Sequence, residues 1–238
     1  MAVALNPFAE RTARFADRKS LGQEIASLIK QAIAEGSLSP GQRIIESRLA
    51  RDFGVSLTPV REAIRQLAGE GIIEISPNRG PSVWVVTAED AFELYSLRAM
   101  LEGLAIRMAI ARASPEERAS IQAILDEMER LVDDDGVPSL LDNSRTIHEG
   151  IVRLSKHDYL IAVYNSLALR IAIVNRILGR ESFKRREVEW HRPLVDALLG
   201  RDPDHAERII REHIRESYLA YTAVADGSKP ATGHDVWF

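Results

Sequence analysis

Three histidines in the second half of the chain occupy apolar helical stripes, where a polar side chain needs a hydrogen-bond partner or a ligand. Each recurs at helical spacing with leucine, isoleucine or valine, which points it into a bundle if helices form there. The three are His148, His191 and His213. Imidazole suits Zn²⁺, Ni²⁺ and similar divalent ions, so three converging rings could hold a metal. Each could equally be a hydrogen-bonded core residue, since separate helices need not bring their side chains together.

A second group of candidate ligand-binding residues lies in the stretch SLTPVREAIRQL, residues 56–67. We predict a helix here, with Thr58 as its N-cap and Pro59 as its first residue. Arg61 and Arg65 fall four residues apart, opposite the apolar positions of this helix. Two outward guanidinium groups could contact a polyanion such as DNA, or they could simply be solvated.

The elements around this stretch form a recognisable pattern. A helix is expected over 20–35, opened by a capping box of Ser20 and Gln23, and a short helix over 46–53 ends at Gly54. After the third helix, two apolar runs flank a turn at 77–80 and predict a β-hairpin, Ile72–Ile75 with Val83–Val86. Three helices and a hairpin predict a winged helix-turn-helix, whose third helix can enter a DNA major groove.

From Thr87 onward the pattern is helical throughout, and no convincing strand appears. Clear N-terminal signals stand at Thr87 with Asp90, at Ser114-Pro115 and at Asp202-Pro203. The histidines need these helices to position them. The fold class we predict is mostly α: a winged helix-turn-helix followed by an all-α bundle of about six helices.

Composition places these modules in an ordinary globular chain. The 238 residues include 45% hydrophobic residues and no cysteine, which excludes disulfides and Cys-based zinc sites. Residues 160–178 form the longest apolar stretch, which is too short and too polar to span a bilayer. The net charge is −4, but the first module is slightly basic and the remainder is acidic. We expect a cytoplasmic protein with no membrane partner.

The predicted domain organisation has four parts. Residues 1–19 form a flexible arm, 20–87 the winged helix-turn-helix, 88–226 the helical domain, and 227–238 a tail.

The first module resembles the DNA-binding domain of the GntR family of bacterial transcription regulators. The resemblance rests on AIAEGSLSPGQRI (32–44), LARDFGVS (49–56), TPVREAIRQLAGEGII (58–73) and PNRGPSV (77–83). It implies a double-stranded DNA operator as partner and a homodimer on a pseudo-palindromic site. The DNA-contacting positions that it implies are Ser56, Leu57, Thr58, Arg61, Arg65, Arg79 and Gly80.

Leu57 departs from the family pattern, which usually has arginine in a Ser-Arg-Thr-Pro run. Leucine cannot hydrogen-bond a base edge and can make only apolar contact, for instance with a thymine methyl group. We therefore expect an operator sequence different from the family's usual one.

The second module resembles the FCD ligand-binding domain of the FadR subfamily. The matching pieces are AFELYSLRAMLEGLAIRMA (91–109), IHEGI (147–151), EWHRPLVDALLGRD (189–202) and HAERIIREHI (205–214). In that family an aspartate and three histidines hold a divalent metal such as Zn, Ni or Mn, and His148, His191 and His213 match the histidines. Ser144 replaces the aspartate, so we expect weaker metal binding, a water in that coordination position, or no metal.

Arg98 has two interpretations. It could pair with Glu102, one turn along the same helix. The resemblance instead implies that Arg98 grips the carboxylate of a small organic or sugar acid, with Tyr95, Asn175 and Trp190 lining the cavity.

These observations predict a DNA-binding transcription regulator, a repressor controlled by a small carboxylate, and not an enzyme. A metal-free regulator that binds a longer acyl ligand is one alternative. A metal-dependent hydrolase is another, because three histidines and an open position are typical of catalytic zinc sites.

Overall fold

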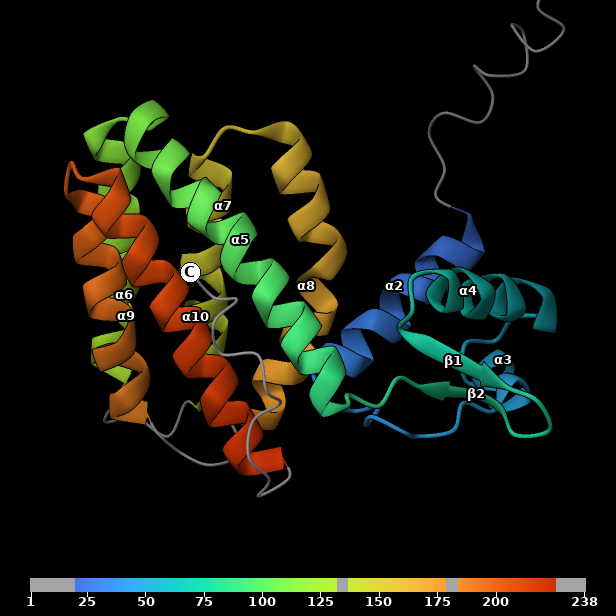
Figure 1. Cartoon of the computed structure of the whole chain (residues 1–238). Helices are drawn as coiled ribbons and strands as arrows, with labels where there is room; N and C mark the ends of the chain where they lie inside the picture. The colour runs from blue at the N-terminus through green and yellow to red at the C-terminus, as the bar shows by residue number, and fades with distance from the viewer. Residues whose placement is uncertain (1–19, 132–136, 179–183, 226–238) are drawn as a thin grey trace, which may run out of the picture. The chain divides into compact units, whose positions relative to one another are not determined.

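The computed structural model describes residues 20–131, 137–178 and 184–225, so the predicted arm (1–19) and tail (227–238) lie outside the described residues. The chain divides into two compact units, Met1–Trp84 and Val85–Phe238, close to the predicted boundary at residue 87 (Figure 1).

The first unit has the predicted order of three helices and a hairpin. Its elements are α2 (Leu21–Ala34), α3 (Glu46–Asp52), α4 (Leu57–Gly69), β1 (Ile73–Ser76) and β2 (Gly80–Val83). The capping box that opens α2 forms as predicted, with Ser20 and Gln23 exchanging side-chain bonds to each other's backbone N–H. Gly54 follows α3 with a φ of 66°, a conformation that glycine adopts without strain.

The start of α4 differs from the prediction. The helix begins at Leu57 with Ser56 at the N-cap, so Thr58 is the second helical residue and Pro59 the third. The reason is that the first four N–H groups of a helix have no partner inside it, so proline fits anywhere in that turn and does not fix the first residue. No side-chain bond caps this end.

The hairpin forms, but its second strand begins earlier than Val83–Val86. Strands β1 and β2 are antiparallel, with Ile73 opposite Val83 and Ser76 opposite Gly80. Residues 80–82, which are not an apolar run, can pair with β1 because a two-stranded wing needs only one buried face. Positive φ angles at Asn78 (67°) and Gly80 (75°) turn the chain and place Arg79 at the exposed tip.

The second unit is a bundle of six helices in the described part of the chain. They are α5 (Ala88–Arg112), α6 (Pro115–Leu131), α7 (Val137–Leu154), α8 (Asp158–Leu178), α9 (Lys184–Leu199) and α10 (Pro203–Ala225). Capping boxes at Thr87 and Ser114 form as predicted. The Asp202 carboxylate accepts from the backbone N–H groups of Asp204 and His205 at the start of α10.

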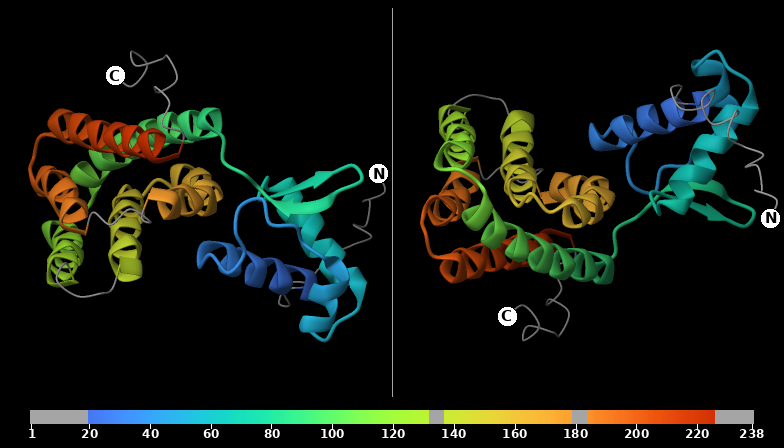
Figure 2. Two further views of the ribbon diagram at one scale, coloured as in Figure 1. Left: turned by 90° about the horizontal axis from the view of Figure 1, so that it is seen from below. Right: turned by 90° about the horizontal axis from the view of Figure 1, so that it is seen from above.

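Helix α5 is the central element of this unit. It packs against α7, α8, α9 and α10, and it runs beside α10 along one face of the bundle (Figure 2). Gly103 permits the close approach, since a Cβ there would lie 2.9 Å from Nε of Arg211 on α10. No described helix combines the length and apolar character that crossing a membrane would require.

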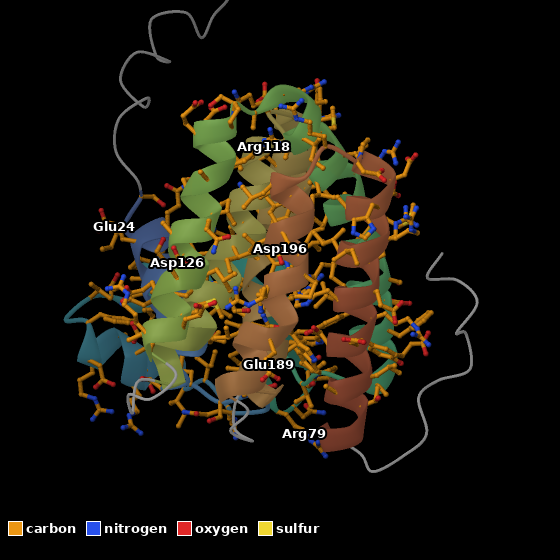
Figure 3. All side chains as sticks on the ribbon, turned by 90° about the vertical axis from the view of Figure 1, so that its left-hand side faces the viewer. Glu24, Arg79, Arg118, Asp126, Glu189 and Asp196 are labelled. Carbon is orange, nitrogen blue, oxygen red and sulfur yellow. The ribbon has the colours of Figure 1, made fainter. Side chains whose placement is uncertain are left out.

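A buried arginine fixes the end of α9. Arg118 on α6 donates hydrogen bonds to the carbonyl groups of Leu198 (3.2 Å) and Gly200 (2.9 Å), and Figure 3 labels Arg118 near that end of the bundle. A cation at a helix C-terminus also complements the helix dipole. This contact sets the position of the helix that carries His191.

Candidate ligand site and DNA-facing residues

The three histidines converge inside the bundle from α7, α9 and α10. Nε2 of His148 lies 3.1 Å from Nε2 of His213 and 3.3 Å from Nε2 of His191. All three side chains are buried, and their ring centroids are 4.5–5.2 Å apart. One ligand atom from each lies within 4.8 Å of the others, which is the arrangement a shared ion needs.

Glu102 on α5 orients the first of these rings. Its Oε2 atom lies 2.5 Å from Nδ1 of His148, and both side chains are buried. A carboxylate only accepts here, so the His148 proton belongs on Nδ1 and the lone pair of Nε2 faces the other rings.

His213 is held in a similar way by backbone. Its ring hydrogen-bonds the backbone of Trp190, and its Nε2 lies 3.1 Å from Nε2 of His148. Two ring nitrogens at this distance repel each other when both present lone pairs, unless a proton or a cation lies between them.

The environment of His148 and His213 favours their neutral form. Burial lowers the pKa of His213 well below its ordinary value, and the nearby His191, His148 and Arg98 lower it further. Burial also lowers the pKa of His148, although Glu102 opposes that shift. Neutral imidazole is the form that binds a metal ion.

Ser144 lies at the site, one turn before His148 on α7. Its Oγ is 3.0 Å from Nε2 of His191, and the residue is buried. The position therefore faces the histidines as the family pattern implies, with a hydroxyl where a carboxylate would stand. A neutral oxygen adds no charge to offset that of a cation.

Arg98 and Glu102 form a buried ion pair. Nε of Arg98 lies 2.5 Å from Oε1 of Glu102, so the intrahelical pairing considered from the sequence occurs. Burial alone would lower the pKa of Arg98, but the adjacent carboxylate keeps it above its ordinary value. Among the described residues this is the only hydrogen bond of the Arg98 side chain, so its terminal nitrogens are available to a ligand.

The other residues predicted for the effector lie nearby. Tyr95 is buried and donates its hydroxyl to Oδ1 of Asn175 (2.8 Å), and the guanidinium carbon of Arg98 lies 5.5 Å from the Tyr95 ring centre. Asn175 and Trp190 are half-buried. Contacts thus join Arg98, Tyr95 and Asn175, and the backbone of Trp190 bonds His213.

Two residues of this site, Glu102 and Tyr164, are not predicted from the sequence as part of a ligand site. Glu102 was considered only as a partner of Arg98, and Tyr164 on α8 was not considered. Tyr164 hydrogen-bonds Glu102, and burial together with that carboxylate raises the pKa of Tyr164 well above its ordinary value. No local signal could have found these contacts, because they join helices far apart in sequence.

The predicted DNA-contacting residues are exposed on the first unit, except Gly80, which is half-buried. Ser56 is the N-cap of α4, Leu57 and Thr58 begin the helix, and Arg61 and Arg65 follow on its outer face. Leu57 is 39% exposed. Arg61 has a partner that the sequence did not reveal, since its Nε lies 2.8 Å from Oε2 of Glu46 on α3.

Comparison with known proteins agrees with both units. Residues 21–83 match the bacterial regulatory proteins of the gntR family, and residues 93–216 match the FCD domain. The chain is 32% identical over 182 residues to the Nta operon transcriptional regulator of Aminobacter aminovorans, covering 75% of this chain and 84% of that one. It is 28% identical over 198 residues to the gluconate operon transcriptional repressor of Bacillus licheniformis, covering 80% and 81%.

The fold is also found among solved structures. Escherichia coli McbR superposes with a TM-score of 0.73 at 22% identity, covering 86% of this chain and 98% of that one. The relatives from Aminobacter aminovorans and Bacillus licheniformis are named as a transcriptional regulator and a transcriptional repressor, so the hydrolase alternative is set aside. The chain belongs to the GntR family of bacterial transcription regulators, in its FCD-containing, FadR-like subfamily.

Proposed function

We propose that this regulator is a cytoplasmic repressor that binds an operator through its first unit and releases it in response to a small carboxylate bound in its second unit. The observation that carries the effector assignment is the buried Arg98 guanidinium, of which Nε alone hydrogen-bonds a residue that the structure describes. An arginine fork matches a carboxylate in shape and charge.

DNA binding is assigned to the first turns of α4 and to the wing tip. Thr58, Arg61 and Arg65 are exposed along one helix, and Arg79 is exposed at the turn between β1 and β2. In a winged helix-turn-helix these are the positions that reach the major groove and the neighbouring backbone. Contacts to phosphates supply a large share of the affinity and make it fall with salt.

The effector class follows from charge and size. One arginine and three imidazoles are polar groups that can bind the oxygens of a short organic or sugar acid, and the Glu102 carboxylate offsets the charge of Arg98. The relative from Bacillus licheniformis is named for a gluconate operon, and gluconate is such an acid. A long acyl ligand would need apolar lining instead, so the metal-free acyl alternative is less well supported.

The residues present fit a divalent metal. Metal–nitrogen distances of about 2.0–2.1 Å in a tetrahedral site separate the ligand nitrogens by about 3.3–3.4 Å. The separations of Nε2 of His148 from Nε2 of His213 and of His191, 3.1 and 3.3 Å, are close to this value. His148, His191 and His213 would hold the ion, and Ser144 would adjoin it. The ion would supply a positive charge that attracts one oxygen of the effector carboxylate.

We further propose that two copies bind a pseudo-palindromic operator, because two-fold symmetric proteins match two half-sites. Three apolar side chains on one face of α5 support a pairing surface. Leu97, Met100 and Leu104 are 44–53% exposed and recur at helical spacing.

Two measurements test the proposal. A gel shift with DNA flanking the gene should show sequence-dependent binding at moderate salt, and its absence would overturn the regulator assignment for this DNA-binding unit. A thermal-shift screen of small carboxylic acids, with and without added Zn²⁺, should find acids that raise the melting temperature, since a ligand that binds only the folded state stabilises it. The same acids should give no shift in Arg98→Lys, which keeps the charge but loses the fork.

A further inference from the structure

The helices α3 and α4 of the DNA-binding unit are joined by one charged contact on their exposed side. Oε2 of Glu46, the first residue of α3, lies 2.8 Å from Nε of Arg61 in the second turn of α4. The two side chains are 30% and 54% exposed, respectively. Within the described residues, Arg61 makes no other side-chain hydrogen bond.

Stability does not account for this contact. Ion pairs between exposed side chains contribute little to folding, because water screens the attraction and two long side chains lose conformational freedom. The two helices also pack against each other, and each buries apolar residues, Ala50 on α3 and Val60 and Ala63 on α4. Removing the Glu46 carboxylate should therefore leave the unit folded.

Nor does simple attraction to DNA account for it. A carboxylate 2.8 Å from an arginine that meets DNA brings negative charge toward the phosphates. On electrostatic grounds alone, Glu46 weakens binding to every DNA sequence. Its benefit must therefore lie in something other than overall affinity.

The contact does fix how Arg61 presents its guanidinium. The bond uses Nε, at the side of the group nearest the chain, and no described residue hydrogen-bonds the two terminal nitrogens. Those nitrogens are the pair that can donate together to O6 and N7 of a guanine in the major groove. A side chain held in advance loses less conformational freedom when it binds.

We propose that Glu46 is a positioning residue for sequence reading: through its bond to Nε it orients Arg61 toward one base, trading overall affinity for discrimination. This inference rests on the proposed DNA-binding function. Arg61 reads the base, and Glu46 acts only through Arg61.

The test compares two duplexes in the full-length protein. One is selected from a random library by the wild-type protein, and the other is a random-sequence duplex of equal length. Glu46→Ala should lower the ratio of the two affinities about tenfold, the loss expected when one bidentate contact is weakened. Binding to the random duplex should be unchanged or tighter. Glu46→Gln, whose amide oxygen still accepts from Nε, should retain most of the ratio.

A matched control separates positioning from charge. Asp52 on the same helix forms an exposed pair with Arg48 (3.6 Å), so Asp52→Asn removes one negative charge without touching Arg61. It should tighten binding to both duplexes equally and leave their ratio unchanged. In the Arg61→Ala background, Glu46→Ala should have no further effect on the ratio.

The outcomes are distinguishable. The inference is overturned if Glu46→Ala keeps its fold by circular dichroism and leaves the ratio of the two affinities unchanged. It is also overturned if Glu46→Ala lowers that ratio as much in the Arg61→Ala background as in the wild-type protein. If the wild-type protein itself selects no preferred sequence, the proposed DNA-binding function fails instead.

Discussion

The Glu102 carboxylate and the His148 imidazole are 2.5 Å apart across the interface of α5 and α7, and both are removed from water. The other oxygen of the same carboxylate meets Arg98. Burial alone would raise the pKa of Glu102, but Arg98 and His148 hold it below its ordinary range. One ionised carboxylate thus joins the proposed effector arginine to a proposed metal ligand.

We predict that Glu102→Gln weakens Zn²⁺ binding by about 10- to 100-fold, the usual cost of losing a residue that orients a metal ligand. The amide oxygen can still accept from Arg98, so its NH₂ group faces Nδ1 of His148. The His148 proton then moves to Nε2, where the metal must bind. Competition with a chromophoric chelator measures the affinity.

Glu149→Gln is the control, since Glu149 lies on the same helix as His148 but pairs with Arg145 instead. It should leave the affinity unchanged. If wild type and Glu102→Gln bind Zn²⁺ with equal affinity, Glu102 only balances the positive charge of Arg98 and does not orient His148.

Ser144→Asp should tighten Zn²⁺ binding by at least about tenfold, because a carboxylate adds a fourth, charged ligand beside His191. Isothermal titration calorimetry on protein stripped of metal measures this. Ser144→Asn, similar in size but neutral, should gain much less. If Asp gains nothing, the three histidines are core residues and not a metal site.

Leu57→Arg should change which operator the protein prefers. A selection from random duplexes should shift toward a guanine in each half-site, by about 1–3 kcal/mol of discrimination. Leu57→Ala should show no such shift, because it removes the side chain without adding donors. An unchanged preference in Leu57→Arg would place residue 57 outside the reading surface.

Gly150→Ala should destabilise the second unit by about 1–3 kcal/mol, the usual cost of overpacking. A Cβ at residue 150 on α7 would overlap with Cδ1 of the buried Ile121 on α6. Urea unfolding measures the change. Ile121→Val removes that methyl group, so the double variant should be more stable than the sum of the two single changes predicts.

The helices and their first residues could be predicted wherever two residues close in sequence form a capping box. Ser20 with Gln23 and Thr87 with Asp90 lie three residues apart, so their capping boxes are visible in the sequence. The start of α4 was misplaced because Pro59 permits several positions in the first turn and no cap bond selects one.

The site could be predicted only in part. Three apolar stripes indicated that the histidines point inward, but convergence depends on how α7, α9 and α10 pack. The bond from His148 to Glu102 spans 46 residues, and that from Arg61 to Glu46 spans 15. Both depend on the placement of separate helices, which side-chain periodicity does not specify.

The start of α5 has a mechanical consequence. The helix begins at Ala88, and only residues 85–87 separate it from the end of the first unit. Three residues offer about six soft dihedral angles, and the helix beyond them is stiff. Arg98 lies about 15 Å along its axis from Ala88 at the usual rise. If an anion bound at Arg98 displaced α5, only residues 85–87 would lie between that helix and the end of the first unit.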